Sequence, residues 1–169
     1  TIEEFNTLSK DIVAAELERC CGSKRWIDRI NTLRPFTDVS SIYNCADNVW
    51  LSLIEVDWKE AFTHHPKIGD VENLRKKFAS TSRWAEGEQQ GVRSASEETI
   101  RLLAEGNERY EKKFGYIFIV CATGKSADEM LSLLNHRLPN DPANEIHIAA
   151  EEQRKITRLR LEKLFSPSI

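Results

Sequence analysis

Apolar residues recur at helical spacing along most of this chain. Intervals of three and four residues place them on one face of an amphipathic helix. The spacing predicts a first helix that runs from Ile2 and ends near Gly22, and a second over Trp26–Leu33. The second helix has to stop before Pro35, because proline disfavours helical backbone in the residue that precedes it.

Residues that cap helices mark the starts and ends of further elements. Ser40 and Ser41 are candidate N-caps of a third helix, and Asp57 is a candidate cap of a short fourth. Farther along, the spacing predicts a long helix over Ser96–Phe114, which Gly115 terminates.

The last two predicted helices also begin at recognisable caps. Ser126 opens a helix that runs through Leu138, with an acidic residue three positions after the serine, as in a capping box. Asp141 caps the final helix and Pro142 takes its first position. Together the patterns predict an all-α fold, a single compact domain of about eight helices over residues 1–169.

Two segments depart from the helical pattern. Residues 63–82 are mostly polar, and we expect His65 to lie in a loop there because it precedes Pro66. Tyr116–Ala122 is a short, continuous apolar run. Periodicity alone does not tell whether such a run is a strand or part of a buried helix.

Composition and charge narrow the class of protein. The chain has 169 residues, of which 40% are hydrophobic and 30% charged, as in a globular protein. No apolar run approaches the roughly 20 residues of a transmembrane helix. The formal net charge of -3 gives no general attraction to nucleic acid or to anionic lipid. We therefore expect neither nucleic acid nor a membrane as a partner.

The four cysteines form no C-x-x-C pair, and no signal peptide is recognisable. We expect reduced thiols and a cytoplasmic location. The C-terminal residues Ser-Pro-Ser-Ile do not match the peroxisomal S-K-L signal, although a peroxisomal location stays open for a eukaryotic source.

His65 is the first candidate for chemistry. Histidine exchanges protons readily near neutral pH, since its unperturbed pKa is about 6.5. The rigid Pro66 that follows restricts where the His65 ring points. From the sequence alone a solvated surface histidine is the favoured explanation, and the adjacent His64 competes for the role.

Residues 84–91 form a second candidate segment, rich in carboxylates, amides and glycines. If a helix begins there, its free amide groups favour an anionic ligand. Glu88 could hold a histidine and raise the pKa of its ring. Alternatively, Glu86 and Glu88 only stabilise a helix N-terminus, where acidic side chains are favoured.

The final predicted helix carries many charges, most of which form a solvated face. Arg158 and Arg160 lie among its apolar positions, so one of the two could project toward a cleft. A guanidinium there would bind a carboxylate or carbonyl group. Periodicity does not decide which arginine does so.

No motif for a metal or a cofactor appears. The sequence lacks H-E-x-x-H, the dinucleotide-binding G-x-G-x-x-G pattern, the phosphate-binding loop and the G-x-S-x-G serine hydrolase motif. We therefore predict no metal ligands and no cofactor.

The order and spacing of several short motifs resemble the family of 2-oxo-4-hydroxy-4-carboxy-5-ureidoimidazoline (OHCU) decarboxylases. His65-Pro66-Lys67-Ile68-Gly69 resembles the H-P-x-I-G motif of that family, and Gly87-Glu88-Gln89 matches the end of its S-x-x-E-Q motif. The likeness covers nearly the whole chain, from about Phe5 to Phe165. It continues through Asn107-x-x-Tyr110, Lys113-Phe114-Gly115-Tyr116-Ile117-Phe118, Arg137-Leu138-x-Asn140, Glu151-x-x-Lys155-Ile156 and Arg160-Leu161.

The resemblance implies a cofactor-free, all-α lyase of purine metabolism. Members of the family decarboxylate OHCU to S-(+)-allantoin and CO2 during urate degradation, and they are generally homodimers. We accordingly expect OHCU as the small-molecule substrate and a homodimer as the assembly.

The resemblance also assigns roles to individual residues. His65 matches the catalytic proton donor, and we expect Glu88 to hold it. Ala85 stands where the family motif has serine, so the hydroxyl group of that serine is missing here. The residues that match substrate-binding positions are Pro66, Ala85, Glu86, Gly87, Gln89, Phe118, Ile119, Val120, Cys121, Ala122 and Arg160.

Two other functions stay open at this point. A hydrolase of a related ureido intermediate would use similar residues, and release of CO2 would separate it from a decarboxylase. A non-catalytic helical interaction module would expose a large apolar patch and leave His65, Glu88 and Arg160 scattered.

Overall fold

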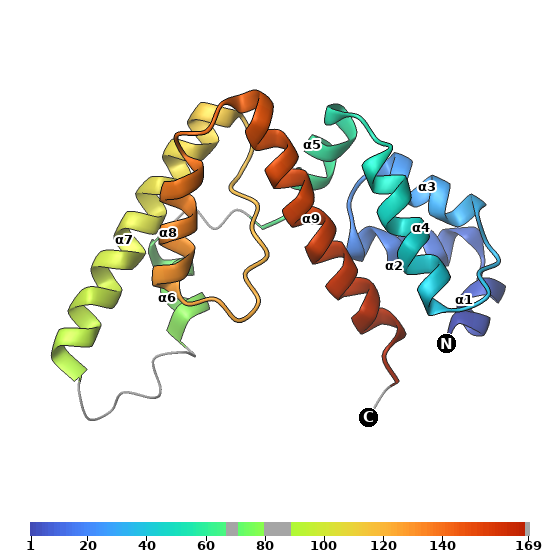
Figure 1. Ribbon diagram of the computed structural model, residues 1–169. Coiled ribbons are helices and arrows are strands. Elements are labelled where there is room, and N and C mark those ends of the chain that lie inside the picture. Colours follow the sequence, from blue (N-terminus) through green and yellow to red (C-terminus); the bar gives the residue numbers. More distant parts are fainter. Residues whose placement is uncertain (67–70, 80–88, 168–169) are drawn as a thin grey trace. The chain divides into compact units, whose positions relative to one another are not determined.

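The computed structural model describes residues 1–66, 71–79 and 89–167. All regular secondary structure in these ranges is helical, which confirms the all-α prediction (Figure 1). No helix there is both long enough and apolar enough to span a bilayer. The helices are α1 (Ile2–Thr7), α2 (Lys10–Cys20), α3 (Lys24–Thr32), α4 (Val39–Leu51), α5 (Glu55–Thr63), α6 (Val71–Ala79), α7 (Gln89–Phe114), α8 (Ala127–Arg137) and α9 (Pro142–Phe165).

Contacts divide the chain into two compact units. The first unit comprises Thr1–His65, Ile119–Cys121 and Ile146–Ile169, and the second comprises Pro66–Phe118 and Ala122–Glu145. The first unit therefore holds α1 to α5 and most of α9, and the second holds α6, α7 and α8. The prediction of one domain over residues 1–169 stays a prediction.

Three buried tryptophans connect the helices of the first unit. The indole nitrogen of Trp26 on α3 donates to the carbonyl oxygen of Ala46 on α4 at 3.1 Å. Trp50 on α4 donates to the carbonyl oxygen of Ala150 on α9 at 2.8 Å, and Trp58 on α5 donates to that of Trp50 at 3.1 Å. Each ring is thus buried with its one polar atom paired, as a stable core requires.

The predicted first helix is two helices. Leu8 has extended backbone, with φ -66° and ψ 152°, and it separates α1 from α2. Ser9 then caps α2, because its hydroxyl oxygen accepts from the amide of Ile12 at 3.4 Å. The prediction of one continuous helix was wrong because apolar spacing continues across this cap.

Two predicted N-caps lie inside the first turn of their helices. Asp38 caps α4 in place of Ser40 or Ser41, and its carboxylate accepts from the amide of Ser41 at 2.7 Å. Ile54 is the N-cap of α5, and the Asp57 carboxylate accepts from the Ile54 amide at 3.3 Å. Ser41 and Asp57 are therefore the residues that reach back to the cap, which is the other half of a capping box.

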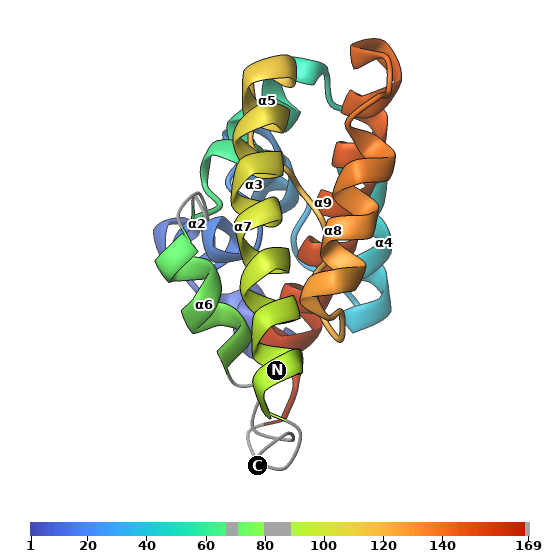
Figure 2. The same ribbon diagram turned by 90° about the vertical axis from the view of Figure 1, so that its left-hand side faces the viewer.

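In the second unit α7 and α8 run side by side in the same direction (Figure 1; Figure 2). Their contacts advance along both helices together: Thr99 with Asp128, Gly106 with Leu134, and Tyr110 with Arg137. A methyl group at Gly106 would lie 2.5 Å from a Leu134 methyl, so the glycine permits this close approach.

The ends of α7 and α8 agree only in part with prediction. Helix α7 begins at Gln89, before the predicted Ser96, and it ends at Gly115, whose φ of 81° few other residues adopt. Ser126 caps α8 as predicted. The apolar run Tyr116–Ala122 between them is neither strand nor helix but an irregular connection.

Sequence reasoning missed α6, which lies in the polar stretch 63–82. Its few apolar residues follow helical spacing, and Leu74 and Phe78 are 3% and 8% exposed. Helix α6 packs against α7. Two buried side chains one turn apart are therefore enough to hold this short helix against the core, although its other residues are mostly polar.

A buried carboxylate anchors the end of the second unit. Glu145 is fully buried, and it accepts from Arg137 Nε at 2.6 Å, from the Tyr110 hydroxyl at 2.5 Å and from Asn140 Nδ2 at 2.9 Å. Its charge is thus paired and its oxygens are hydrogen-bonded, as burial of an ion requires. Tyr110, Arg137 and Asn140 belong to the motifs noted above, and their contacts here explain them structurally.

We expect Glu145→Gln to destabilise the protein by about 3–5 kcal/mol, because it removes the charge of the buried carboxylate that pairs with Arg137. Urea unfolding of both proteins measures the difference in the free energy of unfolding. The matched control is Glu98→Gln, which removes an exposed ion pair with Arg101 and should change the free energy little. Similar losses in the two variants would contradict the anchoring role.

Candidate functional site

His65 follows directly on the buried end of α5. Ala61 and Phe62 in the last turn are 1% and 0% exposed. The backbone amide of His64 donates to Ala61 at 3.2 Å and that of His65 donates to Phe62 at 3.3 Å, so the chain turns tightly there. His65 is half-buried in this turn, outside regular secondary structure, as predicted.

Helix α9 presents a buried polar stripe in the same unit. Gln153 and Thr157 are 1% and 6% exposed, and Arg160 is half-buried. Their spacing of four and three residues places all three on one face of the helix. The amide nitrogen of Gln153 donates to the Thr157 hydroxyl oxygen at 3.1 Å.

A hydrogen bond joins His65 to this stripe. The imidazole Nε2 lies 2.5 Å from Oε1 of Gln153. The bond connects the turn after α5 to the middle of α9, and it fixes the plane of the imidazole ring. His65 is therefore a positioned histidine rather than a solvated surface residue.

Burial lowers the pKa of the His65 imidazole below its usual value, and the positive charge of Arg160 lowers it further. The hydrogen bond to Gln153 acts in the opposite direction, because an acceptor favours the protonated ring. The net effect is a lowered pKa, which favours the neutral ring at pH 7. The described residues therefore lower the pKa of His65, whereas a contact with Glu88 was expected to raise it.

The two arginines of α9 have different surroundings. Arg158 donates to Asp47 at 3.1 Å, and its guanidinium lies 4.7 Å from the centre of the Tyr43 ring, so it joins α9 to α4. Arg160 donates to the carbonyl oxygen of Cys20 at 3.3 Å, and its charge acts on His65. Of the two arginines, Arg160 is thus the one whose charge acts on the His65 ring, and its contact with substrate stays a prediction.

The predicted segment 118–122 contacts α9 at Cys121. Its backbone amide donates to Glu152 at 3.3 Å, and Lys155 pairs with the other oxygen of Glu152 at 2.7 Å. Ile119 is 2% exposed and Val120 is half-buried in the same unit. These residues match substrate-binding positions of the family, and the backbone amide of Cys121 is already occupied by Glu152.

The remaining described residues of the predicted site belong to the second unit. Pro66 is exposed directly after His65. The Phe118 ring packs 4.5 Å from the Arg137 guanidinium, and the Ala122 carbonyl oxygen accepts from Lys125 at 3.0 Å in a turn. These contacts account for Phe118 and Ala122 within that unit.

Part of the predicted site lies outside the described residues. Ala85, Glu86, Gly87 and Glu88 fall there, and Gln89 is described only as the first residue of α7. Their roles, including the contact between Glu88 and His65, stay predictions.

Sequence reasoning missed Gln153, Thr157 and Glu152. A signal for the first two was present, because they occupy core positions of α9 by helical spacing. The buried residues of that face are Ile146, Ala149, Ala150, Gln153, Thr157 and Leu161. A polar residue at a core position has to find a buried partner, and this could have drawn attention to Gln153.

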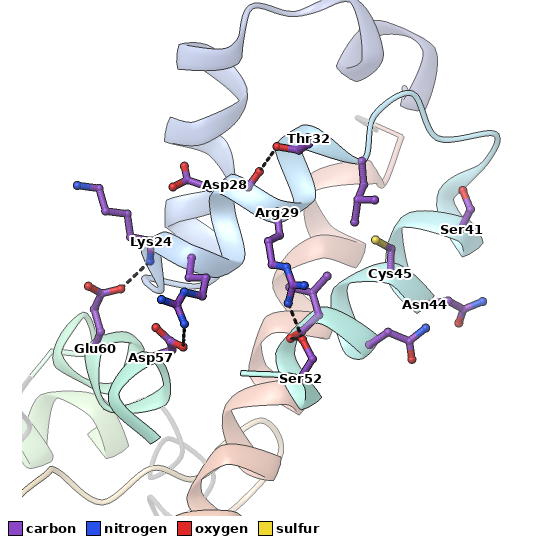
Figure 3. Close-up of a pocket in the computed structure, with 14 residues that line it drawn as sticks. Lys24, Asp28, Arg29, Thr32, Ser41, Asn44, Cys45, Ser52, Asp57 and Glu60 are labelled. Carbon is purple, nitrogen blue, oxygen red and sulfur yellow. Dashed lines mark hydrogen bonds and ion pairs between the residues drawn. The ribbon is translucent and has the colours of Figure 1, made fainter. Parts of the chain in front are cut away.

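A groove of about 1090 Å³ lies between α3, α4 and α5 (Figure 3). None of the predicted site residues lines it. Among the side chains that line it, Arg25 pairs with Asp57 at 3.4 Å, Arg29 donates to the Ser52 hydroxyl at 2.8 Å, and Glu60 accepts from the backbone amide of Lys24 at 2.6 Å. Within the ranges given above, no group of three or more His, Cys, Asp or Glu side chains is arranged to hold a metal ion.

The first unit thus combines a neutral, oriented imidazole with a guanidinium. A guanidinium attracts a carboxylate or a carbonyl oxygen. A neutral imidazole beside it can accept and return one proton. The pair suits a reaction of an anionic small molecule that includes a proton transfer.

Comparisons with a family model and with known proteins agree with one another. The sequence model of the OHCU decarboxylase family matches residues 6–162. The chain is 41% identical to the uric acid degradation bifunctional protein TTL of Arabidopsis thaliana, in a match that covers 94% of this chain and 49% of that protein. It is 28% identical to the uric acid degradation bifunctional protein of a Bacillus species, covering 97% of this chain and 32% of that protein. The chain thus spans about half and about a third of these two relatives.

Solved structures agree with the sequence matches. A crystal structure of OHCU decarboxylase in the presence of (S)-allantoin has a TM-score of 0.71 and 37% sequence identity, covering 90% of this chain and 98% of that one. A crystal structure of (S)-allantoin synthase, 14% identical with a TM-score of 0.67, shares the fold.

We expect Gly22→Ala to destabilise the first unit by about 1–3 kcal/mol and to displace His65, because overpacking forces neighbours to move. A methyl group at Gly22 would overlap Cβ and Cγ of His64, the residue beside His65. Urea unfolding and the NMR signal of the His65 ring measure the two effects. Gly106→Ala, which meets only Leu134 in the second unit, is the control, and it should leave the His65 signal in place. An unchanged His65 signal in Gly22→Ala would contradict the expectation.

We expect Arg160→Gln to raise the pKa of His65, because it removes a positive charge that disfavours the protonated ring. NMR-detected pH titration of the imidazole measures the shift. Arg158→Gln removes the same charge from the arginine that pairs with Asp47, and it should leave the pKa of His65 nearly unchanged. A lower pKa in Arg160→Gln, or equal shifts in both variants, would show that Arg160 does not act on His65.

Proposed function

The chain belongs to the OHCU decarboxylase family, and on that premise we propose that it converts OHCU to S-(+)-allantoin and CO2 in urate degradation. The observation that carries the proposal is the pairing of His65 with Gln153, within electrostatic reach of Arg160. This arrangement supplies a proton carrier and a cation to one small anionic substrate.

The reaction follows from the structure of the substrate. OHCU carries a carboxylate and a hydroxyl group on the same ring carbon, next to the carbon that bears the ureido group. When the bond to the carboxylate breaks, CO2 leaves and the bonding electrons move into the ring, where the neighbouring imine accepts them. A proton added to one face of the ureido-bearing carbon then gives a single enantiomer. Because the ring itself accepts the electrons, the scheme requires no cofactor.

His65 supplies that proton in the proposed scheme. Its ring is held at one angle by Gln153, so the proton approaches the substrate from one side. General acid catalysis by a positioned side chain contributes about 10²- to 10⁴-fold to a rate. The predicted role of Glu88 becomes part of the proposal as a negative charge near the ring, which favours the protonated form of His65.

Arg160 is the proposed cation for the substrate. Its guanidinium would bind the carboxylate before cleavage and an oxygen of the ring afterwards. The amide of Val120 is proposed as a further donor. Cys121 is omitted from this set because its amide donates to Glu152.

The structure argues against one of the two alternative functions more strongly than against the other. An interaction module would leave His65 and Arg160 scattered, whereas the charge of Arg160 acts on the His65 ring. A hydrolase of a related ureido compound would use the same pair, so the released product has to distinguish it. The homodimer and the cytoplasmic location stay predictions.

We expect His65→Asn to fold normally and to lose about 10²- to 10⁴-fold in the formation of S-(+)-allantoin. Freshly generated OHCU serves as substrate, CO2 release gives the rate, and circular dichroism gives the enantiomer. His136→Asn, which replaces an exposed histidine of α8, should retain full activity. Near-normal turnover in His65→Asn would overturn the assignment of His65. An intact protein that consumes substrate without CO2 release would favour the hydrolase.

A further inference from the structure

We propose that Gln153 is a positioning residue which, with Thr157 behind it, keeps a proton on Nε2 of His65 and leaves Nδ1 to exchange a proton with the substrate. The inference rests on the proposed function, since it names the atom through which the proposed proton transfer takes place.

The first step concerns burial. Gln153 is 1% exposed, so both ends of its amide need partners within the protein. One end lies 2.5 Å from Nε2 of His65, and the other lies 3.1 Å from the Thr157 hydroxyl oxygen. Rotation of the amide by half a turn would exchange its oxygen and nitrogen between these two partners.

The second step fixes the direction of the amide. The Thr157 hydroxyl hydrogen-bonds the thiol of Cys21 and opposes the effect of burial, which raises the pKa of that thiol to about 12. A hydroxyl group has a single proton. The Gln153 amide nitrogen donates to the Thr157 hydroxyl oxygen at 3.1 Å, which leaves the hydroxyl proton for the Cys21 sulfur. The amide nitrogen of Gln153 therefore faces Thr157, and its oxygen faces His65.

The third step assigns the proton of the histidine. An amide oxygen only accepts, so the ring nitrogen beside it has to carry a hydrogen. In the neutral ring that hydrogen is on Nε2, and the lone pair is then on Nδ1. No hydrogen bond from the described residues reaches Nδ1, which leaves that atom for the substrate.

The consequence is a defined path for one proton. Nδ1 takes a proton from solvent, and the ring becomes an imidazolium with Nε2 still bound to Gln153. The Nδ1 proton then passes to the ureido-bearing carbon of the substrate, where it forms a C–H bond with the electron pair that departing CO2 left in the ring. His65 returns to the same neutral tautomer, so the Nε2 proton stays in place throughout.

Nitrogen-15 NMR of histidine-labelled protein without substrate tests the tautomer, with His65→Asn to assign the signals. In the intact protein the neutral His65 ring should carry its hydrogen on Nε2. Thr157→Val frees the amide to rotate and should populate the tautomer with hydrogen on Nδ1. Gln153→Leu removes the acceptor and should lower the pKa of His65, whereas Gln153→Glu adds a negative charge and should raise it.

Kinetics with OHCU test the role in the reaction. We expect kcat of Gln153→Leu to fall by about 10- to 100-fold with a smaller change in KM, as when other groups that orient a functional imidazole are removed. Gln153→Glu retains an acceptor and should recover part of kcat. Thr99→Val removes a buried hydrogen bond to Asp128 in the second unit, and it should change neither the His65 signal nor kcat.

Each result decides the proposal. A neutral ring with its hydrogen on Nδ1 in the intact protein overturns it, as does an unchanged kcat in Gln153→Leu. Failure of the proposed function would appear separately, as an intact protein that releases no CO2 from OHCU. The tautomer is measured without substrate, so it identifies which of the two ideas has failed.

Discussion

The hydrogen bond between His65 and Gln153 is the interaction on which the candidate site depends. It joins residues 88 positions apart, and one of them is almost fully buried. An unpaired polar group in that place would cost about 1–3 kcal/mol, so the turn after α5 has to remain against α9. The same rule governs Glu145 in the second unit, where a buried charge gathers Tyr110 and Arg137. The motifs of the chain therefore include residues that satisfy buried polar groups.

Much of the fold could be predicted from the local sequence. The errors in the predicted helices share one cause. Apolar spacing found most helices, and Ser126 and Gly115 marked helix ends correctly. Spacing cannot register a break such as Ser9, because the apolar period continues through the cap. It also overlooked α6, in which Leu74 and Phe78 are the core residues of a mainly polar helix. Such elements are determined by what they pack against, which a local pattern does not contain.

For the candidate site, some residues could be identified from the sequence and others could not. His65 was identifiable because imidazole chemistry and the following proline both single it out. The choice between Arg158 and Arg160 depended on partners from other helices, namely Asp47 and Cys20, and no period along α9 contains them. Gln153 was overlooked because an amide does not titrate, although its place in a buried stripe implied a partner. A residue proposed to orient another side chain is thus harder to find from sequence than the side chain that it would orient.

The low pKa of His65 has a consequence under the proposed function. Decarboxylation consumes one proton, yet burial and the charge of Arg160 keep the free ring neutral. A bound carboxylate offsets the guanidinium charge and favours a protonated ring beside it. Proton uptake by His65 is then coupled to substrate binding, because the bound anion adds a negative charge near the ring. The cation that attracts the substrate therefore also delays protonation of the histidine until the substrate is in place.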